Sequence, residues 1–255
     1  MFYIIIFLTF LITFLYCKNK NKNTINIIVS GGLSNRIRTI LGYRKKAIKT
    51  GKNPIHVYWG KNKECDCNFY DIFESIDNVI ILNNIIDVSY YHHIIGTPTY
   101  EEITGGEISN EEIKYDYKNL LKLKPSLQFE VDYFLKNNLP NFISIHVRRT
   151  DHNNGIYNNK FKITTDNDFY NFIDNFSEIS LVFLTTDNFE TQNSFIKKYP
   201  NKIIIYQKIN TDSTDLNKRN TSIETAVIEI YIASKSKYFK QSNYSSFSEF
   251  IEYLR

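Results

Sequence analysis

Short, unbroken runs of β-branched and other apolar residues recur along the chain, separated by polar turns and by longer segments with apolar residues at helical spacing. Runs without apolar–polar alternation are typical of strands buried on both faces of a parallel sheet. The alternating order predicts an α/β protein with doubly wound sheets. We expect strands at 25–29, 54–59, 78–82, 142–147, 181–184 and 203–206, and helices at 36–50, 69–73, 118–138, 168–176 and 189–199, from Ser222 onward and up to Leu254.

The same order of strands and helices is present before and after residue 139. We therefore expect two Rossmann-like domains, residues 25–139 and 140–255, facing a cleft, since pockets favour domain interfaces. Residues 83–115 fit neither pattern, because they are interrupted by Gly96, Pro98, Gly105 and Gly106. We expect a long surface connection there, with a role in acceptor specificity.

An uncharged apolar stretch, residues 2–16, precedes the first expected strand. It is shorter than the roughly 20 residues of a usual transmembrane helix. A secretory signal peptide would need a basic start and a small-residue cleavage site, and neither is present. We expect an uncleaved membrane-anchor helix at 1–17 and a polar linker at 18–24. The linker lysines would keep the domains cytosolic, so a lumenal catalytic domain would have to override that bias.

The net charge is +4, and the basic residues are concentrated near the start of the chain. No Asp or Glu occurs before Glu64, whereas seven Lys or Arg residues lie between Arg36 and Lys52. A basic half could contact nucleic acid, but no nucleic-acid recognition motif accompanies it. We prefer a solvated helix face near a phosphate ligand, and we expect no nucleic-acid partner.

The cysteines and the acidic pairs predict neither a metal site nor a disulfide framework. Cys65 and Cys67 have no second cysteine pair and no nearby histidine ligand, which argues against zinc. The tripeptide Asp166-Asn-Asp168 resembles a metal-binding motif, but turn and helix-cap chemistry explains it better. We expect no metal and no other cofactor.

The hexapeptide His146-Val-Arg-Arg-Thr-Asp151 continues the apolar run that begins at Phe142. In open α/β sheets, ligands bind at the carboxyl ends of the strands. Guanidinium groups suit phosphate, because they donate paired hydrogen bonds and keep their charge. The hexapeptide therefore predicts a site for a phosphate-sized anion near Arg148. The alternative is a strand end with two solvated charges.

Three further segments join a strand to a helix or begin a helix, although each alone is ordinary. The loop Gly31-Gly32-Leu-Ser-Asn35-Arg36 lets a ligand approach the backbone at a helix N-terminus. It lacks the Gly-Lys-Ser/Thr of a Walker A loop and the third glycine of the dinucleotide fingerprint. Thr186-Asp187 ends a strand, and Ser245-Ser246-Phe-Ser248 begins a helix, as capping residues do.

Taken in order, and with Trp59, Cys65 and Asp71-Ile-Phe73 between them, these motifs resemble the fucosyltransferase-like superfamily over about residues 25–254. The nearest resemblance is to α1,6-fucosyltransferases, and a more distant one is to protein O-fucosyltransferases. It implies a GT-B fold, GDP-fucose as donor, a glycan or glycoprotein acceptor, inversion at the sugar and no essential metal. With the anchor, it suggests an endoplasmic reticulum, Golgi or viral-factory membrane.

The resemblance also implies roles for single residues. Arg148 matches the arginine that grips the donor diphosphate, and without a metal a guanidinium must neutralise that leaving group. Asn35 matches an asparagine of the glycine-rich loop near the donor. The other matching positions, which shape the hexapeptide loop or line the donor pocket, are Gly31, Gly32, His146, Arg149, Asp151, Asp187, Ser245 and Ser246.

The chain departs from the family where the catalytic base is often found. Residues 152–156 contain no acid, and the position of a frequent second acid is Asn188. The base is therefore unassigned, with His152 and Asp151 as candidates. Two alternatives stay open: a protein that binds a nucleotide sugar or a glycan without catalysis, and a transferase that uses another nucleotide sugar.

Overall fold

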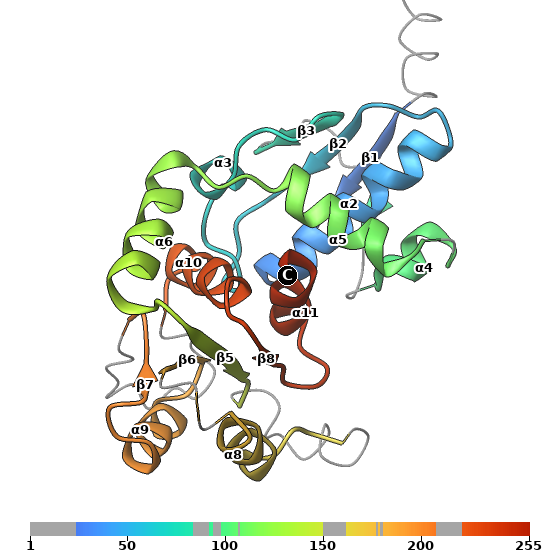
Figure 1. Cartoon of the computed structure of the whole chain (residues 1–255). Helices are drawn as coiled ribbons and strands as arrows, with labels where there is room; N and C mark the ends of the chain where they lie inside the picture. The colour runs from blue at the N-terminus through green and yellow to red at the C-terminus, as the bar shows by residue number, and fades with distance from the viewer. Residues whose placement is uncertain are drawn as a thin grey trace, which may run out of the picture. The chain divides into compact units, whose positions relative to one another are not determined.

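The structure is a computed structural model that describes residues 24–83, 92–93, 98–106, 108–149, 162–176, 178, 181–207 and 221–255. Backbone contacts divide the chain into two compact units, whose elements are drawn in Figure 1. Unit 1 comprises Met1–Tyr70 and Ser75–Ser109, and unit 2 comprises Asp71–Glu74 and Asn110–Arg255.

Unit 1 contains a four-stranded parallel sheet in the order β3-β2-β1-β4. The strands are β1 (Ile25–Ile28), β2 (Ile55–Tyr58), β3 (Val79–Leu82) and β4 (His92–His93). The helices are α2 (Leu33–Lys49), α3 (Phe69–Ile72), where the chain passes between the units, and α4 (Tyr100–Thr104). The core of the unit is apolar, with fully buried side chains from strands and from α2, among them Ile27, Ile37, Ile40, Ile55 and Val57.

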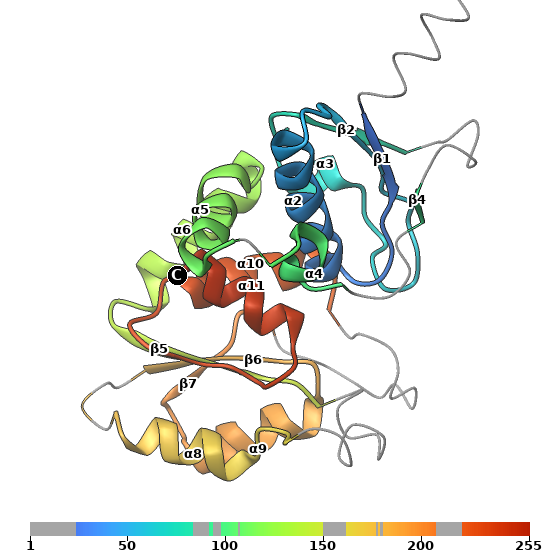
Figure 2. The same cartoon turned by 90° about the vertical axis from the view of Figure 1, so that its right-hand side faces the viewer.

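Unit 2 repeats this sheet order as β7-β6-β5-β8, again with all strands parallel. The strands are β5 (Phe142–Val147), β6 (Leu181–Thr186), β7 (Ile203–Ile204) and β8 (Phe239–Lys240). One face is covered by α8 (Asp166–Asp174) and α9 (Phe189–Lys198), and the other by α10 (Ile223–Ser234) and α11 (Ser246–Leu254), as Figure 2 shows. The two parallel sheets with their helices confirm the predicted α/β class.

The central strand β5 is buried along its whole length. Successive side chains of a strand point to opposite faces of the sheet. Ile143 and Ile145 therefore pack in the apolar cluster with Phe169 of α8. Ser144 points to the other face, where its hydroxyl donates to the carbonyl of Ala233 in α10 at 3.0 Å. Burial on both faces explains why this strand has a continuous apolar pattern.

The helix expected over residues 118–138 is two helices, α5 (Asn110–Leu120) and α6 (Pro125–Asn138). Pro125 stands at the first position of α6, where its fixed backbone angle and missing N–H are tolerated. The residues between the helices bond to unit 2's short segment at 71–74: the amide of Lys124 donates to the carbonyl of Ile72 at 2.9 Å. The interruption between α5 and α6 is thus accompanied by a contact between segments far apart in the sequence.

Both α5 and α6 belong to unit 2, because α5 packs on α11 and α6 packs on α10. The compact units therefore change at Ser109–Asn110, whereas the sequence placed the boundary at residue 139. The predicted cleft concerns the placement of the two units relative to each other, and it stays a prediction.

Residues 83–115 are not the featureless surface connection that the sequence suggested. They include β4, α4 and the start of α5. Thr99 and Glu102 form a capping box at the start of α4, and the side chains of Tyr100 and Ile103 are buried where α4 packs on α2. Strand β4 has only two residues, so its pattern is too short to stand out.

The predicted anchor at 1–17 and most of the linker lie outside the described residues. Within the part of the chain that the structure describes, no helix combines the length and apolar character that crossing a bilayer requires.

Candidate functional site

The carboxyl ends of β5 and β6 bring Arg148 and Asp187 together. Val147 and Thr186, the last residues of the two strands, are register partners, so the residues that follow them are neighbours. A guanidinium nitrogen (Nη1) of Arg148 lies 3.0 Å from Oδ2 of Asp187, and the two side chains are 18% and 11% exposed. The other oxygen of Asp187, Oδ1, accepts a hydrogen bond from the backbone amide of Arg149 at 2.9 Å. One carboxylate thus fixes both residues of the arginine pair.

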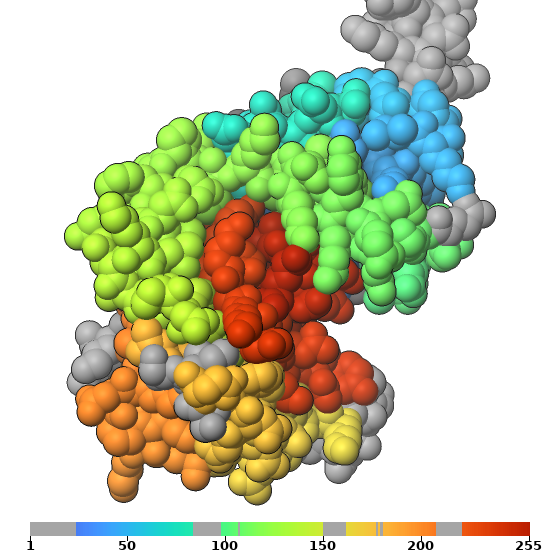
Figure 3. Space-filling view, in the orientation of Figure 1, coloured from blue at the N-terminus to red at the C-terminus, as the bar shows by residue number. Residues whose placement is uncertain are grey.

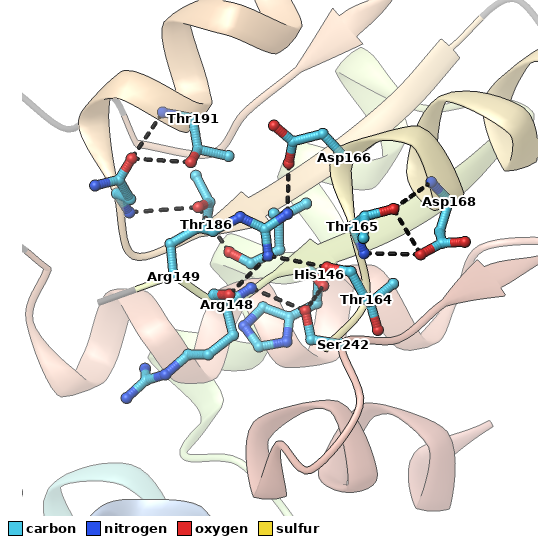
Figure 4. A network of polar contacts seen from close by, with 12 residues as sticks. His146, Arg148, Arg149, Thr164, Thr165, Asp166, Asp168, Thr186, Thr191 and Ser242 are labelled. Atoms are coloured by element: carbon cyan, nitrogen blue, oxygen red, sulfur yellow. Dashed lines mark hydrogen bonds and ion pairs between the residues drawn. The ribbon is translucent and has the colours of Figure 1, made fainter. Parts of the chain in front are cut away.

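The two adjacent arginines have different surroundings. Arg149 is buried; its guanidinium pairs with Asp166 and donates to the carbonyls of Arg148 and Thr164 at 3.0 and 3.2 Å. It also lies 5.8 Å from the ring of Phe169. Figure 4 shows the Arg149 side chain turned into this polar network and the Arg148 side chain extending away from it. Arg149 therefore supports the site from within the protein, and Arg148, paired with Asp187, is the more exposed of the two arginines.

Asp166 and Asp168 have protein partners that favour the cap interpretation of their motif. Thr165 and Asp168 form a capping box at the start of α8. The backbone and side-chain hydrogen bonds from Thr165 lower the pKa of Asp168. Asp166 is the ion-pair partner of Arg149. Among the described residues, no group of three or more His, Cys, Asp or Glu side chains is arranged to hold a metal ion.

His146 connects the end of β5 to the start of α11. Its Nδ1 lies 2.7 Å from the hydroxyl of Ser248, and its ring stacks on Phe247 with a centroid separation of 4.4 Å. The ring is 3% exposed. His146 therefore acts as an internal connection that fixes the first turn of α11 beside the hexapeptide.

Ser242 completes this connection, and the sequence did not single it out. Its hydroxyl donates to the carbonyl of His146 at 2.8 Å and accepts from the amide of Arg148 at 2.9 Å. Its own amide donates to the hydroxyl of Ser248 at 3.1 Å. Ser242 follows β8, a two-residue strand paired with β5. Only that pairing, across more than ninety residues of sequence, places it at the site.

The N-terminus of α11 is capped as the sequence indicated. The hydroxyl of Ser245 accepts from the amide of Ser248 at 3.4 Å. Ser246 and Phe247 occupy the first two helical positions, whose amides have no partner within an α-helix. These amides, together with the helix dipole, favour an anion.

Asn188, the residue after Asp187, caps α9. Its side-chain oxygen accepts from the amide and the hydroxyl of Thr191, both at 2.8 Å. An amide oxygen performs this capping without a charge. Asn188 is therefore occupied in fixing the first turn of α9.

The glycine-rich loop of unit 1 is built around Arg36. Gly31 has a φ of +79°, which suits glycine. The buried guanidinium of Arg36 donates to the carbonyls of Gly31 and Gly60 at 2.7 and 2.6 Å, and also to that of Trp59. Burial lowers the pKa of Arg36, and the nearby ionisable groups of Cys65, Cys67 and Glu64 act in the opposite direction. Arg36 therefore holds the loop after β1 to the loop after β2.

Polar side chains gather over Gly31. A Cβ atom at this position would lie 3.6 Å from Oε2 of Glu64 and 3.7 Å from Nδ2 of Asn35. The side-chain oxygen of Asn35 accepts from Nη2 of Arg38 at 3.0 Å. Asn35 and Glu64 thus place polar side chains beside Gly31 in unit 1.

Cys65 and Cys67 are buried free cysteines whose sulfur atoms lie 3.8 Å apart. The carbonyl of Cys67 accepts from Nε1 of Trp59 at 2.7 Å. The pair therefore belongs to the packed layer beneath the glycine-rich loop.

The structure brings Arg148, Asp187, His146 and the serines of α11 together in unit 2, and it places Asn35 with the two glycines in unit 1. The candidate bases Asp151 and His152 lie outside the described residues. Their assignment stays a prediction.

No protein-family model matches the sequence, and no curated protein matches it. Solved structures match nearly the whole chain. NodZ α-1,6-fucosyltransferase soaked with GDP-fucose gives a TM-score of 0.57 at 14% identity, covering 91% of this chain and 92% of that one. POFUT1 in complex with GDP-fucose gives 0.56 at 10% identity, with coverages of 92% and 94%. A mutant of Arabidopsis thaliana FUT1 in complex with GDP gives 0.52 at 11% identity, with coverages of 91% and 68%.

At these identities the similarity shows a shared fold. The resemblance is thus confirmed for the fold, which this chain shares with these fucosyltransferase structures.

Proposed function

We propose that this protein is a glycosyltransferase that transfers fucose from GDP-fucose to a glycan or glycoprotein acceptor, with inversion at the sugar. The observation that carries the proposal is the position of Arg148. It lies at the carboxyl end of the central strand β5, beside the N-terminus of α11, in a fold shared with fucosyltransferases whose structures contain GDP or GDP-fucose.

Arg148 would neutralise the donor diphosphate. Breaking the glycosyl bond leaves extra negative charge on GDP, and a fixed cation stabilises that charge most effectively where water is scarce. A guanidinium can donate two parallel hydrogen bonds to one phosphate group. Asp187 orients this guanidinium at 3.0 Å, so the cation is in place before the donor binds.

The first turn of α11 would provide a second contact for the diphosphate. The amides of Ser246 and Phe247 stand at the positive end of the helix, where phosphate groups bind in many α/β proteins. His146, Ser242 and Ser248 join this turn to the hexapeptide. The two anion-binding elements are therefore held in one frame, and Arg149 with Asp166 supports it from beneath.

Inversion requires a base that takes the proton of the acceptor hydroxyl as that oxygen attacks the sugar carbon. Asp151 and His152 remain our candidates for this role. We expect no metal in the reaction, because Arg148 and the helix amides would supply the charge stabilisation that a metal often provides.

Calorimetric titration of the purified full chain with GDP and with GDP-fucose tests the proposal. Arg148→Ala should weaken GDP binding by about 100-fold, and Arg148→Lys by about 10-fold, since lysine keeps the charge but not the fork. Lys136→Ala removes an exposed lysine of α6 and should leave binding unchanged. Equal affinities for the parent chain and Arg148→Ala would overturn the proposal.

A second candidate function is binding of a nucleotide sugar without catalysis. The absence of an acid at residues 152–156 favours it. Single-turnover experiments separate the two: an enzyme consumes GDP-fucose when mixed with acceptor or, slowly, with water, whereas a binding protein returns the donor intact. A panel of GDP- and UDP-sugars in the same assay identifies the donor.

A further inference from the structure

The C-terminal end of α2 carries a dense set of cations around an exposed apolar side chain. Lys46, Lys49 and Lys52 are exposed, and Arg44 and Lys45 are half-buried. Ile48 lies among them with 45% of its surface exposed. We call this set, Arg44, Lys45, Lys46, Ile48, Lys49 and Lys52, the basic edge. In Figure 3 the blue atoms, the colour of α2 and of the strands next to it in sequence, lie on the surface that faces the viewer.

The basic edge is remote from the glycine-rich loop, although both belong to the same strand–helix connection. A helix rises about 1.5 Å per residue, so the 17 residues of α2 separate its ends by roughly 25 Å. Gly32 caps one end, and Lys49 stands at the other. The basic edge is therefore a separate feature from Arg36 and Arg38 in the first turns of α2.

The basic edge lies where the chain enters unit 1. The amide of Lys52 bonds to the carbonyl of Ala47, and Nε of Arg44 donates to the carbonyl of Asp77 at 2.8 Å, just before β3. The first residues of β1, β2 and β3 are aligned in register. The last turn of α2 and the first residue of β1, Ile25, therefore lie at the same edge of the sheet.

The segment that precedes β1 in sequence is first apolar and then basic. Lys18, Lys20 and Lys22 lie in the linker, and residues 2–16 are uncharged and apolar. The eight residues from 17 to 24 span at most about 28 Å when extended. If residues 2–16 enter a bilayer, the basic edge is within reach of its surface.

Lysine side chains interact favourably with the C-terminal end of a helix, and Lys46 and Lys49 have that position in α2. This accounts for two of the five cations. It does not account for Lys52 beyond the helix or for the exposure of Ile48. Clustered Lys and Arg residues with an apolar residue among them are typical of segments that contact anionic lipid headgroups.

We propose that the basic edge binds the surface of an anionic phospholipid bilayer, with its cations at the lipid phosphates and Ile48 at the boundary of the acyl chains. Attachment through residues 2–16 would raise the effective concentration of this contact. The proposed contact also bears on which side of the membrane the two units occupy. Anionic lipids are concentrated in the cytoplasmic leaflet, so the contact agrees with the cytosolic placement that the linker lysines favour.

The experiment uses the full chain in nanodiscs made of phosphatidylcholine alone or with about 30% phosphatidylserine. A short pulse of an amine-acetylating reagent, followed by mass spectrometry, measures the reactivity of Lys46, Lys49 and Lys52. We expect at least a fivefold decrease in the anionic discs, because each cation near the surface contributes about fivefold in binding, and recovery in 0.5 M salt. Equal reactivity in the two discs would overturn the proposal.

A variant series gives the matched control. The triple variant Lys46→Gln, Lys49→Gln, Lys52→Gln should lose the lipid-dependent protection of the neighbouring Lys45. The control triple replaces Lys118, Lys122 and Lys136, which are exposed in unit 2. It removes the same charge, and Lys45 should keep its lipid-dependent protection. Protection by a duplex RNA oligomer but not by anionic discs would point to nucleic acid and against lipid. GDP binding should be equal in both triples, so this test is independent of the proposed transferase activity.

Discussion

The backbone amide of Arg148 donates to the hydroxyl of Ser242 at 2.9 Å, and that hydroxyl donates in turn to the carbonyl of His146 at 2.8 Å. A single serine side chain thus satisfies the backbone on both sides of Val147, where β5 ends. Because Ser248 accepts from the amide of Ser242, the same serine joins the strand end to α11. The geometry of the candidate diphosphate site therefore depends on a residue that need not touch the ligand.

Ser242→Ala should weaken GDP binding by about 10-fold, since it leaves a largely buried amide and carbonyl without their partner, at a cost of about 1–2 kcal/mol. The loss should appear mainly as faster GDP dissociation, because the anion-binding groups are still present but less well held. Stopped-flow measurement with a fluorescent GDP analogue checks this. Ser126→Ala, at an exposed position of α6, should change neither the association rate nor the dissociation rate of GDP. A dissociation rate for Ser242→Ala equal to that of the parent would contradict the assigned role.

Asp187 should be important for stability as well as for binding. It accepts from the amide of Arg149 and pairs with the guanidinium of Arg148. Asp187→Ala leaves a mostly buried cation without this partner and should lower the free energy of unfolding by roughly 2–4 kcal/mol. Asp187→Asn keeps the acceptor for the amide and should cost less. Urea denaturation measures both, and Asp132→Ala, exposed on α6, should cost under about 0.5 kcal/mol.

In unit 1, the buried guanidinium of Arg36 should be important for stability. It is 1% exposed and bonds to the carbonyls of Gly31, Trp59 and Gly60. Arg36→Lys should destabilise the protein by about 2–3 kcal/mol, because a single ammonium cannot reproduce the planar fork. Thermal unfolding checks this. In Arg44→Lys, where the side chain donates to one exposed carbonyl, the melting temperature should stay within a degree or two of the parent.

The central strand shows what the sequence alone could predict. β5 was expected at 142–147 and is observed at Phe142–Val147, because a strand buried on both faces needs an uninterrupted apolar run. β4 and β8 were missed because His92–His93 and Phe239–Lys240 are not runs of β-branched residues, whereas the equally short β7, Ile203–Ile204, was predicted from such a run. The separation of α5 from α6 has a local signal in Pro125, the first residue of α6, whereas the pairing with residues 71–74 is a contact that a local pattern does not encode.

The arginine pair shows the same limit within the candidate site. The sequence identified both Arg148 and Arg149, and the resemblance implied the diphosphate role for Arg148, although the residue types of the hexapeptide do not distinguish the two. Their difference comes from Asp166, 17 residues further on, which pairs with Arg149, and from Asp187, which pairs with Arg148. Residue type and strand position thus located the site. The physical reason why the two arginines differ lies in their tertiary partners.

A buried carboxyl group in α10 predicts how stability depends on pH. Glu229 is 7% exposed, and burial raises its pKa from 4.5 to about 8. Tyr206 interacts electrostatically with Glu229 and with Glu130 of α6, and burial is the cause of the raised pKa of Glu229. In the unfolded chain the same carboxyl should titrate near its ordinary value.

The raised pKa means that the folded state holds the proton more tightly than the unfolded state. The contribution of Glu229 to stability is therefore complete below about pH 4.5 and is lost as the pH rises towards 8. Glu229→Gln cannot ionise, so its stability relative to the parent should increase across this range by several kcal/mol, since one pKa unit corresponds to about 1.4 kcal/mol. Urea unfolding at half-unit pH steps measures the difference. Glu111→Gln, exposed in the first turn of α5, should track the parent, and a pH-independent difference for Glu229→Gln would show that the buried carboxyl does not titrate in this range.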